Sequence, residues 1–351
     1  MMEIKPDKNS NPIEKPLIQI TKFDDLKSIG DLFEKSKDLE LNVIKVLFSE
    51  KYLTQLHIPG IVALIMLTPL QKAPNHLYDF LSKVIYVKPF LENLAKIPDN
   101  YQYCIAMKFA KVACICNKVP EAVQLEVYNH LLGTNPTIYM PSLLYIHAQI
   151  KDPFTCPIQY RKDGRIDTIT LYYLSLNHML KDEFREAEFL LRKCYLLSKS
   201  CKDIRPSIIH KLSLASFLNR TPRDVFKLYI PEKHFPKGIA GDIWEPRLIN
   251  TSQLDGFYQE FESKIVKESA RRIILDYAET TSAISTKDLC KACGVKQNDL
   301  NKILDELAAS GDLKFDKSAD GVITFIALCC VKPVNDELLI TSQLLSSIKG
   351  Q

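Results

Sequence analysis

Glycine is scarce in this chain, with 11 residues among 351. Sheet-rich folds place glycine in their many tight turns, so the scarcity disfavours such folds and is typical of long helices. Long apolar runs are lacking as well. A membrane span needs roughly 18 apolar residues, and the best candidate, 58–70, is shorter and holds two prolines. The charged, proline-containing start of the chain has no apolar signal region, which predicts a protein of the cytoplasm and nucleus.

Charge of one sign is not in large excess. The formal net charge of +4 is too small to indicate a polyanionic partner for the whole chain. The apolar content of 46% and the charged content of 25% are those of an ordinary globular protein. The length is enough for about two or three domains, each with its own core.

The sequence also lacks the common catalytic and cofactor-binding signatures. No HExxH pair, HxH zinc set, GxSxG elbow or glycine-rich phosphate loop occurs. The histidines are dispersed singly, at His57, His76, His130, His147, His178, His210 and His234. We therefore expect no catalytic residue, no metal ion and no bound cofactor, and a function other than that of an enzyme.

Ten cysteines are present. In a protein without a secretion signal we expect thiols that mostly fill the core. Cys290 and Cys293 have the spacing of zinc and redox sites, but no second such pair accompanies them. They fall in a predicted short helix, where residues three positions apart share a face, which favours simple packing. The spacing alone leaves a redox or metal role open.

Proline positions and helical periodicity divide the chain into segments. Residues 1–20 are polar, hold three prolines and predict a flexible tail. Over 21–165, apolar residues recur at helical spacing between prolines that stand about 10–30 residues apart, which predicts stacked helical repeats. The further segments are a helical bundle at 166–261, a winged helix at 262–330 and a terminal helix at 334–351.

One unit of the helical array has a repeat signature over 171–194. Small residues at Ser175, Ala187 and Cys194 would let two antiparallel helices approach closely, as in a tetratricopeptide (TPR) unit. Leu171 departs from that pattern, because tryptophan is usual there, and any two antiparallel helices would also explain the spacing. A single helical hairpin cannot bury its own apolar face, so neighbouring hairpins must stack on it.

The only tryptophan, Trp244, falls in a connection rich in proline and glycine, 231–250. A large aromatic residue in such a segment has two interpretations. Trp244 either fills a seam between the helical array and the helices that follow, or it lies on a surface that a partner covers.

The most specific pattern lies in 262–326. Its first helix carries apolar residues at three- and four-residue spacing. Ser285 is placed to cap a second, short helix, and Gly294 is placed to end it in the left-handed conformation. A third helix ends at Gly311. Two apolar segments, 313–315 and 322–325, then flank a polar turn and predict a hairpin, so that the order of elements is that of a winged helix.

Charge indicates what this module contacts. Between residues 285 and 325 there are six lysines, no arginine and seven acidic residues, a net charge of −1. The third helix would be the reading helix of a DNA-binding winged helix, and it carries Asp299, Asp305 and Glu306. Because cations supply most of the affinity for phosphate, this helix would repel a duplex. We expect the module to bind protein.

Two stretches and one turn carry a family resemblance. The helical array closes with YYLSLNHMLKDEFREAEFLLRKCYLL, and the winged-helix pattern ends with ILDELAASGDLKFDKSADGVITF. Between them lies the turn Leu218-Asn219-x-x-Pro222, in which Asn219 stands where glycine is commoner. This order resembles the PCI domain, named for the proteasome lid, the signalosome and translation initiation factor three. The resemblance covers about residues 165–330.

The resemblance implies a fold and a role. The implied fold is mainly α, with a right-handed TPR-like helical-repeat solenoid followed by a winged-helix (PCI) module with a small β-sheet and a C-terminal helix. The implied role is that of a scaffold whose partners are other PCI subunits, with a metalloprotease-type catalytic subunit elsewhere in the complex. Within the family the sequence is most similar to signalosome proteins, which act in cullin deneddylation and ubiquitin-ligase regulation. The proteasome lid and the TREX-2 complex of mRNA export are the alternatives.

The way PCI complexes assemble implies two contact surfaces. Winged helices of adjacent subunits pair edge to edge, and the predicted open edge is the return strand of the wing, Val322, Ile323, Thr324 and Phe325. C-terminal helices gather in a bundle, for which the predicted residues are Leu338, Leu339, Leu344, Leu345 and Ile348. Packing of that last helix on its own winged helix is the alternative.

Neither a membrane nor nucleic acid is an expected partner. A basic stripe would favour the mRNA-export alternative, because salt-sensitive RNA binding needs exposed cations. The residues that could form it are Arg161, Lys162, Arg165, Arg271 and Arg272.

Overall fold

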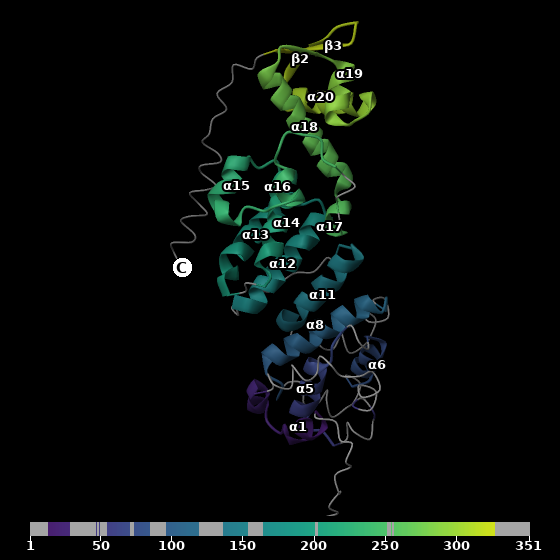
Figure 1. The fold of residues 1–351 in the computed structure, drawn as a ribbon, viewed down its shortest axis with the longest axis vertical. Coiled ribbons are helices and arrows are strands. Elements are labelled where there is room, and N and C mark those ends of the chain that lie inside the picture. The colour runs from purple at the N-terminus through teal and green to yellow at the C-terminus, as the bar shows by residue number, and fades with distance from the viewer. Residues whose placement is uncertain are drawn as a thin grey trace, which may run out of the picture. The chain divides into compact units, whose positions relative to one another are not determined.

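The structure is a computed structural model that describes residues 13–28, 47, 49, 55–70, 74–84, 96–118, 136–153, 164–200, 203–250, 254 and 256–326. Within them the fold is mainly helical, with one small antiparallel sheet (Figure 1). The chain divides into two compact units, Met1–Asn219 and Arg220–Gln351. Among the described helices, none combines the length and apolar character that crossing a bilayer requires.

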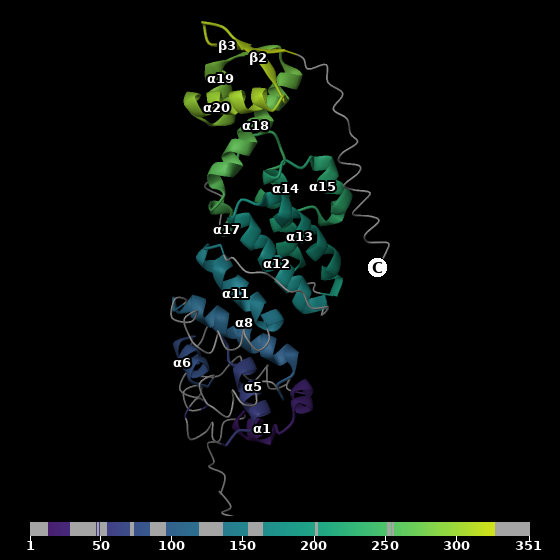
Figure 2. The same ribbon diagram turned by 180° about the vertical axis from the view of Figure 1, so that it is seen from behind.

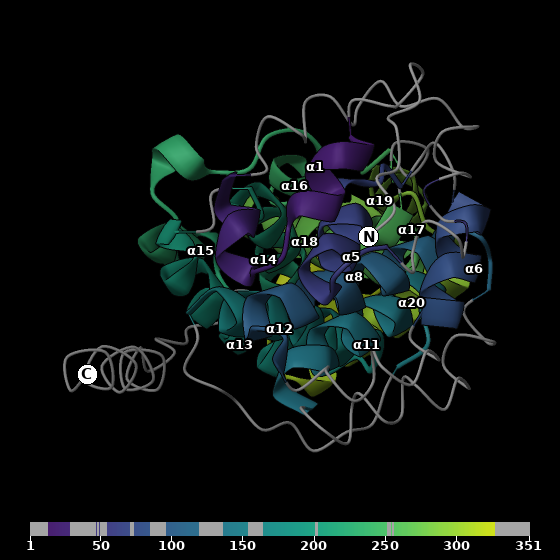
Figure 3. The same ribbon diagram turned by 90° about the horizontal axis from the view of Figure 1, so that it is seen from below.

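Helices make up the described N-terminal part of the first unit. They are α1 (Glu14–Gln19), the 3-10 helix η1 (Phe23–Ser28), α5 (Ile58–Leu67), α6 (Pro74–Val84), α8 (Asp99–Ile115) and α11 (Pro136–Ile150). Both α5 and α6 pack on α8, and α8 packs on α11; α5 and α8 are seen together from below in Figure 3. Their buried faces share one core that includes Leu64, Phe109 and Tyr139.

The predicted flexible tail, 1–20, is wrong for the part that the structure describes. Glu14–Gln19 forms α1, and Ile13, Leu17 and Ile20 are at most 5% exposed. These three residues recur at helical spacing, and α1 packs on α5. Such a short helix is not stable alone, so its packed apolar face stabilises it.

Lys108 joins α8 to the end of α5. Its Nζ donates a hydrogen bond to the carbonyl oxygen of Met66 (2.8 Å), one of the last carbonyls of α5, which have no partner within their own helix. No carboxylate pairs with Lys108 among the described residues. Burial therefore lowers the pKa of Lys108 to about 7, and the charge of Lys111 adds to the effect.

The second part of the first unit contains the predicted helical hairpin. Its elements are α12 (Gly164–Leu180), α13 (Phe184–Leu197), the 3-10 helix η3 (Ser198–Ser200) and α14 (Arg205–Leu218). Figure 2 shows α12, α13 and α14 side by side, and α13 packs on both of the others. Ser175, Ala187 and Cys194 are fully buried. The Cys194 thiol reaches the carbonyl oxygen of Thr168 across the hairpin (3.1 Å), as expected of closely spaced helices.

A buried carboxylate ties α13 to α14. Glu188 is 3% exposed and accepts hydrogen bonds from the Ser216 hydroxyl (2.8 Å) and the Asn219 side-chain amide (2.6 Å). Arg192, one turn along α13, also pairs with it. A buried charge is tolerated when it is paired and hydrogen-bonded, and here three donors satisfy it.

The second unit begins with short elements around Trp244. They are α15 (Arg223–Tyr229), the 3-10 helix η4 (Glu232–His234), α16 (Ile239–Asp242) and α17 (Gly256–Gln259). Trp244 is 3% exposed, so it does not lie on a surface for a partner. Its ring stacks on Phe226 of α15 (centroids 4.9 Å apart), and the Arg272 guanidinium lies over it at 5.0 Å.

A helical module with a small sheet follows. Its elements are α18 (Glu262–Thr280), β1 (Ala283–Ser285), α19 (Thr286–Cys293), α20 (Gln297–Ala309), β2 (Lys314–Lys317) and β3 (Val322–Ile326). The predicted three helices and hairpin are all present in the predicted order. One core joins them, and Ile274, Leu289, Leu304 and Ile323 are buried in it.

Local signals fix the ends of these helices. The Ser285 hydroxyl accepts a hydrogen bond from the Asp288 N–H (3.1 Å) and so caps α19, as predicted. Gly294 has a φ of +66°, and a Cβ there would lie 2.2 Å from Leu248 Cδ1. Gly311, after α20, has a φ of +73° with open space around it. Both glycines therefore end helices in the left-handed conformation.

The order of strands is β1-β3-β2, and both pairings are antiparallel. The predicted open edge, Val322 to Phe325, is therefore wrong, because β3 is the central strand and has neighbours on both sides. β1 supplies the unexpected neighbour, with Ile284 opposite Ile323. The predicted residues of the C-terminal bundle, Leu338 to Ile348, lie outside the described residues.

Candidate protein-interaction surface

The outer side of β2 is the longer open backbone edge of the sheet. Ser318 donates its N–H to the carbonyl oxygen of Val322 (2.9 Å). This bond fixes which residues of β2 direct their backbone groups toward β3 and which direct them outward, because the two kinds alternate along an antiparallel strand. Asp316 therefore pairs its backbone with β3, whereas Phe315 and Lys317 direct their N–H and C=O groups outward. Among the residues that the structure describes, no strand covers that side. These groups can accept a strand from a partner.

The opposite edge, on β1, is shorter. Thr286 donates its N–H to the carbonyl oxygen of Gly321 (2.8 Å), so the same alternation leaves Ala283 and Ser285 on the outer side. The strand runs directly into α19, and the Ser285 side chain is already engaged as its cap. The β1 edge is thus the poorer template for pairing.

Charged side chains line the β2 edge. Lys314, Asp316 and Lys317 are exposed, and Lys317 Nζ donates a hydrogen bond to Asn301 Oδ1 on α20 (3.0 Å). Phe315, between them, packs against the core of the module. Charges on an exposed strand suppress pairing with arbitrary strands. The edge can therefore select a partner with complementary charges.

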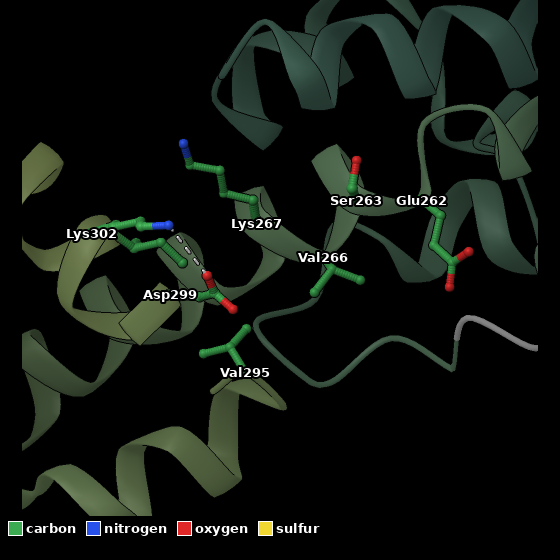
Figure 4. Close-up of a pocket in the computed structure, with 8 residues that line it drawn as sticks. Glu262, Ser263, Val266, Lys267, Val295, Asp299 and Lys302 are labelled. Atoms are coloured by element: carbon green, nitrogen blue, oxygen red, sulfur yellow. Dashed lines mark ion pairs between the residues drawn. The ribbon is translucent and has the colours of Figure 1, made fainter. Parts of the chain in front are cut away.

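A groove lies between the first half of α18 and α20. It has a volume of about 570 Å³, and its apolar lining comes from Val266, Val295 and Ile303. Figure 4 shows the two valines turned toward the same space, with the ion pair of Lys302 and Asp299 (3.8 Å) at its margin. Because both charged side chains are more than half exposed, this ion pair stabilises little and can open at small cost.

The exposed side of α20 is acidic. The helix carries one lysine and three acids, a net charge of −2. Glu306 accepts a hydrogen bond from Lys267 of α18 (2.6 Å), so part of the nearby positive charge is already paired. A helix with this charge would repel the phosphates of a duplex.

The arginines of α18 are engaged inside the protein. Arg271 and Arg272 contact the buried carboxylate of Glu268 (3.3 and 3.2 Å), and Arg271 also pairs with Asp312 (2.9 Å). Arg220 reaches Glu268 from a third direction (3.4 Å). Burial raises the pKa of the Glu268 carboxyl, and the three guanidinium groups oppose that rise.

The side chains of Arg271 and Arg272 are 15% and 17% exposed. They therefore do not supply the C-terminal end of the basic stripe that would favour nucleic acid. Arg161, Lys162 and the side chain of Arg165 lie outside the described residues.

The cysteine pair of α19 is built into the packing of the module. Cys293 is 1% exposed and its thiol lies 3.7 Å from the carbonyl oxygen of Ala270 on α18. Burial raises the pKa of Cys293 to about 12 and also raises that of Cys290. Metal binding and thiol exchange need the thiolate, which this environment disfavours. In the described part of the chain, no group of three or more His, Cys, Asp or Glu side chains could hold a metal ion.

The sequence alone does not identify the residues of the open β2 edge or those of the groove between α18 and α20. The sequence pattern predicts the hairpin that contains Phe315 and Lys317, but the predicted outer strand, 322–325, is the central one. The three residues of β1 are too few to give a clear alternation, so the sequence carries no signal for this third strand. The groove had no signal, because Val266 and Val295 lie in different elements and only folding brings them together.

No protein-family model matches the sequence, and no curated protein matches it. Function must therefore be inferred from the residues and their geometry.

Proposed function

We propose that this chain is a non-catalytic scaffold subunit of a multi-subunit PCI complex. In this proposal the first unit belongs to a TPR-like helical-repeat solenoid, and 262–326 is a winged helix that joins neighbouring subunits by strand pairing. The observation that carries the proposal is the open edge of β2, set in a module with an acidic third helix. Such an edge provides main-chain hydrogen bonds for a partner strand, and the acidic helix disfavours nucleic acid.

The order of elements supports the same proposal. Paired helices precede a three-helix module with a hairpin, which is the order that the PCI resemblance implies. The internal pairing of Arg271 and Arg272 weighs against the mRNA-export alternative, since these cations are not free for phosphate.

Within the PCI family the sequence is most similar to subunit 3 of the COP-9 signalosome, and we propose that the chain occupies that place. That complex removes the ubiquitin-like modifier Nedd8 from cullins, and its activity would reside in a metalloprotease subunit other than this chain. The predicted terminal helix, 334–351, would join the C-terminal bundle of the assembly.

Removal of one backbone N–H group tests whether the β2 edge pairs with a partner strand. Lys317→Pro removes an outward N–H from β2 and leaves the ladder to β3 intact, because the Lys317 backbone does not pair with β3. Lys317→Ala is the matched control, since it removes the same side chain and keeps the N–H. We expect Lys317→Pro to reduce co-purification of the neighbouring PCI subunit from native extracts, with Lys317→Ala retaining it. Equal recovery with both variants would contradict edge pairing by β2.

The identity of the complex needs a second experiment. Purification of the tagged full chain under gentle conditions should recover PCI subunits and a metalloprotease subunit, and the purified assembly should release Nedd8 from a modified cullin. Deletion of 334–351 should reduce recovery of the assembly while the remaining fold persists. A monodisperse monomer from the same extract would contradict the scaffold role.

A further inference from the structure

Three large apolar side chains lie exposed on one face of α13. Phe189, Leu196 and Leu197 are 50%, 47% and 40% exposed. They stand at positions i, i+7 and i+8, so Phe189 and Leu196 share a line along the helix, and Leu197 lies about 80° from Phe189 around it. We call these three residues the α13 stripe. The opposite face of the helix packs inward through Ala187 and Leu191, which are fully buried.

This concentration of exposed apolar surface is not found on other described elements. A single exposed leucine needs no explanation, because folded proteins expose much apolar surface. The other large apolar residues exposed in the described parts of the chain occur one to an element or loop, at Ile18, Ile115, Ile150, Leu228, Leu248 and Ile326. Large apolar side chains gathered on one exposed helix face are typical of an interaction site.

A cation stands on each side of the line that Phe189 and Leu196 form along α13. Arg185 and Lys193 stand four residues before and four residues after Phe189, which places them about 40° to either side of it around the helix. Both are exposed. Between residues 185 and 199 one acid is exposed, Glu186, against three exposed cations, Arg185, Lys193 and Lys199.

We propose that the α13 stripe docks an amphipathic helix of a partner protein whose apolar seam is flanked by glutamate or aspartate. Phe189 and Leu196 lie about 10 Å apart along the helix axis, two helical turns, which matches the spacing of a partner's seam residues. Acidic residues on either side of that seam would meet Arg185 and Lys193, as flanking charges do in paired helices. The surface goes beyond the proposed strand pairing, since it belongs to the first unit and uses no strand edge.

A membrane surface is the poorer match. Amphipathic helices that bind anionic lipid carry a polar face rich in lysine and arginine. Here Glu186 borders the α13 stripe, and Asp182 and Glu183 stand exposed just before the helix. A flat headgroup layer would meet these acids as well as the cations, whereas a helix laid along Phe189 and Leu196 has Arg185 and Lys193 nearest to it.

Site-specific crosslinking in the native assembly tests the proposal directly. A photoreactive phenylalanine analogue replaces Phe189 in the full chain, and the same analogue at Leu228, which is 76% exposed on α15 in the second unit, is the matched control. We expect position 189 to capture a helical segment with acidic residues beside its apolar seam, and position 228 not to capture it. An assembled complex without a crosslink at 189, or capture of a basic or extended segment, would overturn the proposal and leave the strand pairing untouched.

Binding of designed peptides decides the question even if no assembly is recovered. The probes are a synthetic amphipathic helix with a leucine seam flanked by glutamate and the same peptide flanked by lysine. The full chain should bind the glutamate peptide preferentially, Phe189→Ala should weaken binding about tenfold, and Leu228→Ala should leave it unchanged. Lys193→Glu combined with Arg185→Glu should reverse the preference.

Three outcomes of the peptide assay would contradict the proposal. They are equal affinity for both peptides, equal weakening by Phe189→Ala and Leu228→Ala, and binding to phosphatidylserine vesicles in place of either peptide. The first would show that the flanking cations do not select, the second that the α13 stripe is not the site, and the third that lipid is the ligand.

Discussion

Replacement of Lys108 by methionine should stabilise the first unit at neutral and acidic pH. The Lys108 amine is buried between α8 and the end of α5, where no carboxylate among the described residues offsets its charge. Methionine keeps most of the volume of the side chain and removes the charge. The variant loses the hydrogen bond to Met66 but no longer has to bury a cation.

The magnitude follows from the pKa. The pKa of Lys108 is about 7 in the folded protein, against 10.5 for an ordinary lysine. At about 1.4 kcal/mol per pH unit, burial of the protonated amine costs about 5 kcal/mol. Loss of the hydrogen bond offsets about 1 kcal/mol of the gain. Lys108→Met should therefore raise the free energy of unfolding by about 4 kcal/mol at about pH 6.

The gain must shrink as pH rises. The folded protein releases the Lys108 proton near pH 7, whereas the unfolded chain keeps it up to about pH 10.5, so between these values the unfolded state binds more protons. Stability of the parent chain therefore rises with pH across this window. At about pH 9 the advantage of Lys108→Met should have fallen to about 1 kcal/mol.

Urea unfolding followed by far-ultraviolet circular dichroism at the two pH values measures this difference. Hydrogen exchange of α8 peptides locates it in the first unit. Lys199→Met is the control, because it removes an exposed lysine from the same unit that does not act on Lys108. A gain that is equal at both pH values, or a loss at about pH 6, would refute the reasoning.

Four further substitutions test the described packing. Gly294→Ala and Gly311→Ala should each lower the free energy of unfolding by about 1 kcal/mol in chemical denaturation, because both positions require a left-handed φ. The Leu248 side chain that a Cβ at 294 would meet is 57% exposed and can turn away, so the two costs should be similar. Ser285→Ala removes the cap of α19 and should cost about 1 kcal/mol, seen as faster hydrogen exchange at the start of that helix. Glu188→Ala leaves three donors without their acceptor and should cost about 3 kcal/mol; a cost below 1 kcal/mol in thermal denaturation would contradict the role given to this carboxylate.

Helices and their ends were predictable because their signals are local. Apolar spacing identified α18 and α20, and Ser285, Gly294 and Gly311 marked ends through side-chain caps and a left-handed φ. These signals require only a few consecutive residues, so one sequence contains them in full. The short α1 was missed, because its stability comes from packing on α5 rather than from its own sequence.

The arrangement of the strands was not predictable in the same way. β1 has three residues, too few to give a clear alternation, and its pairing with β3 joins positions about 40 residues apart. The buried charges of Lys108 and Glu188 were missed for a similar reason. Their environments are assembled from separate helices, and a lysine or glutamate within a helical pattern is ordinarily read as solvent-facing.

The stacking of Trp244 between Phe226 and Arg272 has a spectroscopic consequence. Because the chain has one tryptophan, its emission is a label-free reporter of the second unit alone, while the first unit contributes tyrosine signal only. Selective excitation of the indole should show a blue-shifted band that moves to the red when α15 and α18 separate. Intact protein can thus reveal which unit melts first, without fragmenting the chain.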